Sequence, residues 1–130
     1  EALNVFNQYF IKNNNDLTAA YLMGVSNFKI KKYSNAIYYL DLANNNSDSE
    51  ILYYLGVSHY ELKNYSKAIR AFKKSLIINP KNQYAIYGLG QTYIESENKR
   101  DSKRQLRSLM NIDQDLFELL KISYDSKFID

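Results

Sequence analysis

The sequence predicts an all-α fold in which antiparallel helix pairs stack into a solenoid. Two observations predict it. Three segments of the chain align when Gly24, Gly56 and Gly90 share one column, and these glycines are 32 and then 34 residues apart. Within each segment apolar residues recur at helical spacing, as Leu52 and Leu55 do before Gly56. Each segment therefore reads as two amphipathic helices.

Composition narrows the class of protein. The chain has 130 residues, of which 45% are hydrophobic and 24% charged, and it has no cysteine. This length suits one domain that folds without covalent cross-links. The missing cysteines exclude disulfides, thiolate zinc sites and a cysteine nucleophile. No apolar run approaches the roughly 18 residues of a membrane span. The chain starts at Glu1 already in helical pattern, so we expect a piece of a longer protein and leave its localisation open.

The periodicity places the elements in order along the chain. The expected helices span 1–13, 17–30, 33–45, 49–62, 65–78, 82–95, 99–111 and 114–125. Ser47 with Glu50 is a candidate capping box, and Asn79-Pro80 offers an N-cap followed by a first-turn proline.

The last helix does not continue the repeat columns well. Its apolar stripe includes Leu116, Leu120 and Ile122, and Asp113 and Asp115 suit the positive end of its dipole. We expect a capping helix that covers the last repeat, with a frayed tail from 126 onward.

The aligned columns resemble the tetratricopeptide repeat, a helix-turn-helix unit of about 34 residues. The second copy carries the resemblance best, through Leu52, Leu55, Gly56, Tyr65, Ala68, Phe72, Leu76 and Pro80. The third copy is degenerate, because Lys99 stands in the column of Tyr33 and Tyr65. The resemblance implies a right-handed solenoid of about three and a half repeats. It divides the single domain 1–130 into 1–16 (second helix of a truncated repeat), 17–48, 49–82, 83–113, and the capping helix with its tail, 114–130.

Packing within the repeats needs small residues beside large ones. Gly56 and Ala68 lack bulk where two helices cross, and Phe72 can fill the space beside them. The expected repeat-packing residues are Gly24, Ala36, Gly56, Ala68, Phe72 and Gly90.

The resemblance implies that partners bind the concave face, through exposed positions of the first helices. Carried over by column, the expected groove residues are Tyr21, Val25, Phe28, Tyr53, Val57, Tyr60, Glu61, Tyr84, Tyr87, Gln91 and Ile94. Tyr21, Tyr53 and Tyr87 share one column and would form a ladder. We expect a third to a half of these tyrosines to pack between helices instead.

Charge is distributed unevenly. Residues 61–110 hold 11 basic and 4 acidic side chains, and the basic ones concentrate on the expected second helices. A basic convex face could meet nucleic acid or anionic lipid. No aromatics are interleaved among these charges, so a solvated face is favoured and neither nucleic acid nor membrane is expected as a partner.

Catalytic, metal and cofactor chemistry find no support in the sequence. The single histidine, His59, falls in a repeat column that packs, so a hydrogen-bonded structural role is expected. Gly88-Leu89-Gly90 lies inside a helical pattern and is not a phosphate loop. We expect no enzyme, no catalytic residue, no metal and no cofactor.

The sequence thus favours a protein-protein interaction module, a scaffold or adaptor that binds a peptide or helix of another protein in a Tyr-rich groove, with Glu61 and Glu95 favouring basic flanks. Two alternatives stay open: an architectural domain that docks on nucleic acid or membrane through its convex face, and a spacer for a missing enzymatic domain. The identity of the partner and the oligomeric state are not encoded in any motif.

Overall fold

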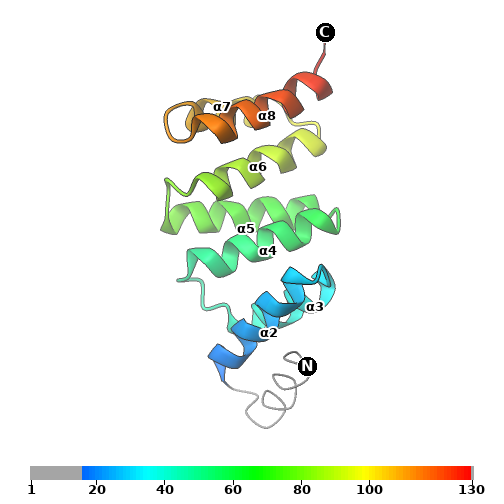
Figure 1. Cartoon of the computed structure of the whole chain (residues 1–130), viewed down its shortest axis with the longest axis vertical. Helices are drawn as coiled ribbons and strands as arrows, with labels where there is room; N and C mark the ends of the chain where they lie inside the picture. The colour runs from blue at the N-terminus through cyan, green and yellow to red at the C-terminus, as the bar shows by residue number, and fades with distance from the viewer. Residues whose placement is uncertain (1–15, 130) are drawn as a thin grey trace.

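The computed structural model describes residues 16–129, and in this part the chain forms helices joined by short turns (Figure 1). The helices are α2 (Leu17–Lys29), α3 (Tyr33–Ala43), α4 (Ser49–Glu61), α5 (Tyr65–Ile78), α6 (Gln83–Glu95), α7 (Lys99–Met110) and α8 (Gln114–Lys127). Their bounds agree with the sequence-based ranges to within two residues. The expected helix at 1–13, and with it the truncated first repeat, lies outside the described residues.

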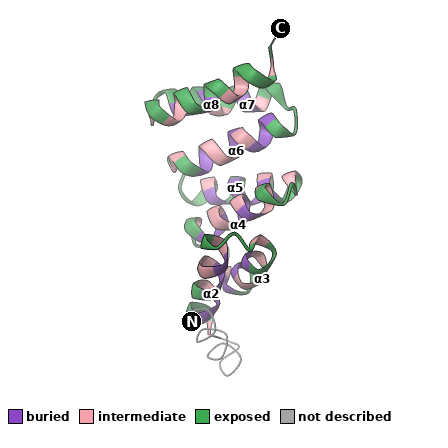
Figure 2. Cartoon of the chain, turned by 45° about the vertical axis from the view of Figure 1, so that its right-hand side comes forward, coloured by how far each residue is buried: buried purple, intermediate pink, exposed green. Residues whose placement is uncertain are grey.

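The helices stack in pairs along the long axis of the molecule. α2 packs on α3, α4 on α5, and α6 on α7, while α8 packs against both α6 and α7 (Figure 1). Buried residues lie on the helix faces that meet other helices, and exposed residues lie on the outside (Figure 2). The all-α helix-pair solenoid expected from the sequence is therefore confirmed.

The helix starts are encoded locally, although not by the residues expected. The side chain of Asp48, not Ser47, caps α4 by accepting hydrogen bonds from the backbone N–H groups of Glu50 and Ile51. Asn82, not Asn79, caps α6 in the same way. Both predicted caps were wrong. In each case an Asp or Asn stands nearer to the first helical residue, and its side-chain oxygen reaches the free backbone N–H groups.

Glycines allow the helices to cross closely. A Cβ atom added at Gly24 would lie 2.7 Å from Leu40 Cδ2, and one at Gly56 would lie 2.6 Å from Phe72 Cε1. Both partners belong to the second helix of the same pair. At Gly90 the nearest atom is instead Leu120 Cδ2 on α8, at 2.6 Å. The last glycine therefore accommodates the C-terminal helix rather than a large side chain of α7.

The turns that end α4 and α6 hold non-glycine residues in the left-handed region. Lys63 has φ 63° and Glu97 has φ 61°. In the first turn the N–H of Lys63 donates to the Tyr60 carbonyl, and that of Asn64 donates to the His59 carbonyl. This is a Schellman arrangement, in which glycine usually occupies the left-handed position because a Cβ is unfavourable there.

Replacing Lys63 by Gly is therefore expected to raise the free energy of unfolding by about 0.5–1 kcal/mol. Chemical denaturation of the two proteins measures this difference. Lys73→Gly is a matched control, because Lys73 is exposed in the interior of α5, where the same change should cost about 1 kcal/mol. Equal destabilisation by both variants would contradict the strain at Lys63.

Candidate interaction groove

An aromatic hollow lies between the first helices of two neighbouring pairs, α4 and α6. Its volume is about 200 Å³. The residues that line it are Tyr53, Val57, Tyr60, Glu61, Phe72, Tyr84, Tyr87, Gly88 and Gln91. We call it the aromatic hollow because five of these side chains are aromatic.

Helical periodicity explains why these residues meet. One face of α4 carries four of the lining residues, because their spacings of four, three and one follow the helical period: Tyr53, Val57, Tyr60 and Glu61. Tyr84, Tyr87 and Gln91 share the facing side of α6 in the same way. Phe72 reaches the hollow from α5, beside Gly88, where an added Cβ would lie 2.5 Å from Phe72 Cζ.

Contacts between the side chains hold the walls in place. The Tyr53 and Phe72 ring centroids are 6.1 Å apart, and Gln91 Nε2 donates a 2.8 Å hydrogen bond to Tyr87 Oη. Burial and then the nearby Glu95 carboxylate raise the pKa of Tyr60 to about 12, with Tyr65, Glu61 and Tyr87 adding smaller effects. The phenol of Tyr60 is therefore neutral at physiological pH and faces negative charge.

A second hollow continues the first toward the starts of α4 and α6. It measures about 540 Å³ and is lined by Ser49, Glu50, Tyr53, Tyr54, Asn79, Asn82 and Tyr84. We call it the polar hollow. Tyr53 and Tyr84 line both hollows, so the two hollows adjoin each other. We call them together the α4–α6 groove.

The structure divides the residues that the sequence assigned to the groove. Those of α4 and α6 other than Ile94 line the aromatic hollow, whereas Tyr21, Val25 and Phe28 belong to α2 and do not. Ile94 is 2% exposed and packs in the core with Leu120, because α8 covers this part of α6. Its assignment to an accessible groove was therefore wrong.

The α2 residues tie neighbouring pairs together. Tyr21 Oη donates a 2.6 Å hydrogen bond to Glu50 Oε1 on α4. This bond, followed by burial, raises the pKa of Tyr21. Phe28 lies 4.8 Å from the Tyr54 ring, centroid to centroid. Both aromatic side chains thus support the stacking of α2 on α4.

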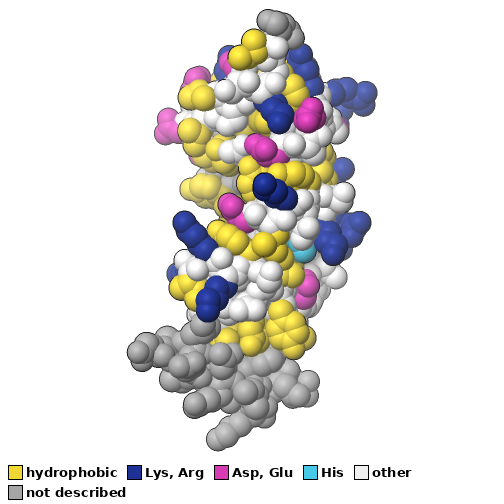
Figure 3. Space-filling model, turned by 90° about the vertical axis from the view of Figure 1, so that its right-hand side faces the viewer, with side chains coloured by type: hydrophobic (Ala, Val, Ile, Leu, Met, Phe, Trp, Pro, Cys, Tyr) yellow, Lys and Arg dark blue, Asp and Glu magenta, His cyan; other side chains and the backbone are white. Residues whose placement is uncertain are grey.

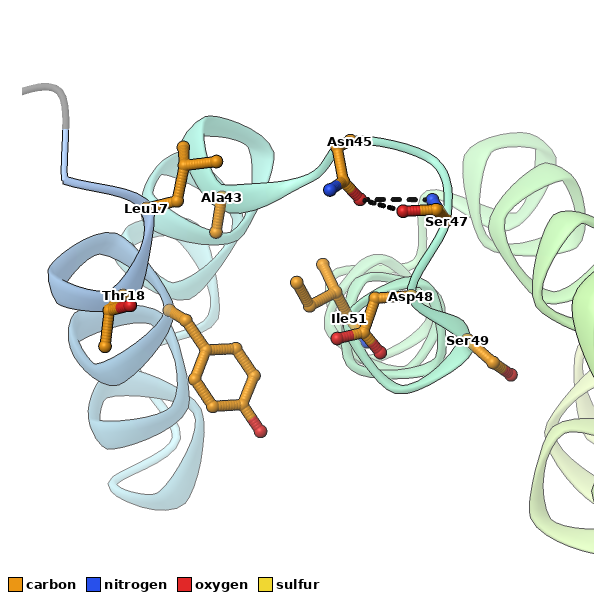
Figure 4. A pocket seen from close by; sticks show the side chains of 9 residues that line it. Leu17, Thr18, Ala43, Asn45, Ser47, Asp48, Ser49 and Ile51 are labelled. Carbon is orange, nitrogen blue, oxygen red and sulfur yellow. Dashed lines mark hydrogen bonds between the residues drawn. The ribbon is translucent and has the colours of Figure 1, made fainter.

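A third hollow of about 450 Å³ lies where α2 meets the loop before α4 (Figure 4). In it, Oδ1 of Asn45 accepts hydrogen bonds from the backbone N–H and the hydroxyl of Ser47. Asp48 is engaged in capping α4. The side chains of Asn45, Ser47 and Asp48 are therefore engaged in hydrogen bonds within the loop and at the start of α4.

The side chains of the described residues 16–129 that could bind a metal include a single histidine, His59. No group of three or more His, Cys, Asp or Glu side chains there could hold a metal ion. Burial lowers the pKa of His59, while the Asp41 carboxylate opposes this effect. His59 Nδ1 is buried without a hydrogen-bond partner, so the expected hydrogen-bonded imidazole is not found at this nitrogen. Within the same residues no helix has the length and hydropathy of a membrane span.

In the middle of the solenoid, Lys and Arg side chains lie on the second helix of each pair (α5 and α7) and not on the first (α4 and α6). The basic residues of α5 and α7 that are exposed are Lys67, Arg70, Lys73, Lys74, Lys99, Arg100, Lys103, Arg104 and Arg107. By contrast, α4 and α6 carry no Lys or Arg. On the side of the molecule seen in Figure 3, basic side chains are separated by acidic, apolar and uncharged ones. That side offers no continuous basic surface.

These observations define the class of protein: a helical-repeat solenoid with an aromatic groove between first helices. The tetratricopeptide repeat family matches residues 49–82, which are α4, α5 and the turn after them. The chain is thus a solenoid of the tetratricopeptide-repeat type, and the resemblance seen in the sequence is confirmed. No curated protein matches it in sequence.

Solved structures show the same fold over nearly the whole chain. A crystal structure of MamA has a TM-score of 0.88 at 18% sequence identity and covers 97% of this chain and 77% of that one. MamA from Desulfovibrio magneticus RS-1, solved from position 41 to its end, has a TM-score of 0.82 at 22% identity and covers 88% and 66%. At these identities the likeness establishes the fold. The repeat match and this fold together support a protein-protein interaction scaffold, a type of module that is typically not enzymatic.

Proposed function

We propose that the chain binds an extended or helical segment of another protein in the α4–α6 groove. The observation that carries this proposal is the convergence of Tyr53, Tyr84 and Tyr87 on one hollow, although they come from two helices. Tyrosine rings bury much area at small entropic cost and keep a polar edge, so they are effective anchors in interfaces. Tyr84 is 55% exposed in the absence of a partner.

The two hollows of the groove offer space for side chains of a partner. The aromatic hollow offers about 200 Å³, and the polar hollow beside it adds about 540 Å³. Glu50, Asn79 and Asn82 line the polar hollow, so hydrogen-bonding groups stand next to the aromatic anchor site. An anchor pocket with an adjacent polar surface is the usual anatomy of a peptide interface.

The test uses a library of short random peptides selected on the immobilised chain. The affinity of a selected peptide is then measured for the wild type, Tyr53→Ala and Tyr87→Ala. We expect at least one of the two variants to bind about tenfold or more weakly, because aromatic anchors dominate binding energy. Both variants should keep the far-ultraviolet helical signal of the wild type.

Two controls make the result specific. Tyr38→Ala removes a tyrosine that is 60% exposed on α3, outside the groove, and should leave the affinity unchanged. The triple change of Lys103, Arg104 and Arg107 to Glu reverses charge on α7 and should also have little effect. Selected peptides that bind both folded groove variants normally, or that depend on the α7 charges, would contradict the proposed function.

A further inference from the structure

We propose that the aromatic hollow receives one cationic side chain, an Arg or a Lys, of the partner segment. This inference rests on the proposed function of the α4–α6 groove and specifies what the groove selects. Its basis is the combination of Tyr53, Tyr60, Tyr84 and Tyr87 with the carboxylate of Glu61 in the lining of a single small hollow.

Aromatic rings and a carboxylate together favour a cation. The face of an aromatic ring is the negative part of its quadrupole and attracts ammonium and guanidinium groups within about 6 Å of the centroid. Glu61 adds a full negative charge at the same hollow, and its side chain is exposed in the absence of a partner. The positive charge of an Arg or Lys would thus find both kinds of stabilisation at once.

The surrounding charges point in the same direction. The charged residues of the two helices that form the groove walls are Glu50, Glu61 and Glu95, apart from the partly buried His59. Glu50 lines the polar hollow, and Glu95 is close enough to act on the Tyr60 phenol. Of the basic residues in 61–110, Lys63 and Lys81 lie in the turns after α4 and before α6, and the others lie on α5 and α7. The two helices that form the groove walls therefore carry acidic side chains and no Lys or Arg, so a basic segment is attracted to them.

Size and desolvation favour a single cationic side chain in the aromatic hollow. A volume of about 200 Å³ is below the roughly 300–1,000 Å³ of small-molecule sites, so the hollow suits one side chain rather than a whole ligand. An apolar side chain such as Leu would take water from the Glu61 carboxylate and the phenol oxygens without replacing its hydrogen bonds. A cationic side chain replaces those hydrogen bonds and keeps its aliphatic stem against the rings.

The experiment starts from peptides selected on the wild-type chain. We expect the selected peptides to share an Arg or Lys at one position. Replacing that Arg by citrulline, or that Lys by norleucine, removes the charge at similar size and should weaken binding about tenfold. Glu61→Gln should weaken the parent peptide several-fold, and the neutral peptide should lose less on this variant than the parent does, because the two groups interact.

Matched variants test whether binding depends on the cation in the hollow or on a general effect of substitution. Glu118→Gln removes the same charge from α8, outside the groove, and should leave the affinity nearly unchanged. Tyr53→Phe keeps an aromatic face and should lose much less affinity than Tyr53→Leu, which should lose about tenfold. Peptides that depend on Tyr53 or Tyr87 but share no basic residue, or that bind equally well as neutral analogues, would overturn this inference and leave the groove proposal standing. A selection that yields no groove-dependent peptide would overturn both.

Discussion

Phe72→Ala is expected to lower the free energy of unfolding by about 3–5 kcal/mol, the largest effect of any single substitution discussed. The Phe72 ring is 0% exposed and lies between α4 and α6, in contact distance of the glycine backbones of both. Removing it leaves a cavity that is bordered by helix backbone. Such a border relaxes little, so both the lost transfer free energy and the cavity contribute.

Chemical denaturation monitored by circular dichroism measures the effect of Phe72→Ala. Ile77→Ala serves as the control, because Ile77 lies on the same helix and is 79% exposed. Its effect should stay within about 0.5 kcal/mol. A Phe72→Ala variant as stable as the parent would mean that α5 does not pack between the first helices as described.

Gly56→Leu is expected to destabilise the chain by about 1–3 kcal/mol through overpacking. Even a Cβ at this position would lie 2.6 Å from the Phe72 ring, and on its other side the ring meets Gly88. The ring cannot give way toward one helix without approaching the other. Ala68→Leu should behave alike, because Ala68 is 0% exposed on α5.

A double-mutant cycle tests whether the two residues act through one contact. Gly56→Ala is measured alone and in a Phe72→Leu background, and its cost should fall in that background because a smaller side chain faces the new methyl group. Thermal and chemical melts give the four stabilities. If Gly56→Ala costs the same free energy of unfolding in both backgrounds, the close approach to Phe72 is not the reason that this position needs glycine. Ser66→Leu, at an exposed position of α5, controls for the added leucine itself.

Much of the fold could be predicted because the repeat columns combine size with spacing. Gly56 and Phe72 are 16 residues apart in the sequence, and their pairing follows from a small column on one helix and a large column on the next. The helix bounds follow from apolar periodicity and turn residues. The choice between Ser47 and Asp48 as the cap of α4 could not be settled in this way, because both side chains can accept the required hydrogen bonds.

The groove could be predicted in part. Columns place Tyr53 and Tyr87 on the concave side, but they say nothing of how closely α4 and α6 approach. That approach depends on Gly88, which no repeat column singles out, and its lack of a side chain lets Phe72 lie beside the hollow. Ile94 was misassigned because the position of α8, whose residues follow the columns poorly, decides its burial.

The most direct test of the central claim is to locate a selected peptide on the chain by nuclear Overhauser effects between peptide protons and aromatic side chains. The α4–α6 groove predicts contacts to the ring protons of Tyr53, Tyr84 and Tyr87, all of which line the aromatic hollow. Contacts confined to the exposed ring of Tyr38 on α3, with none to these three tyrosines, would contradict the account, because they would place the partner outside the groove.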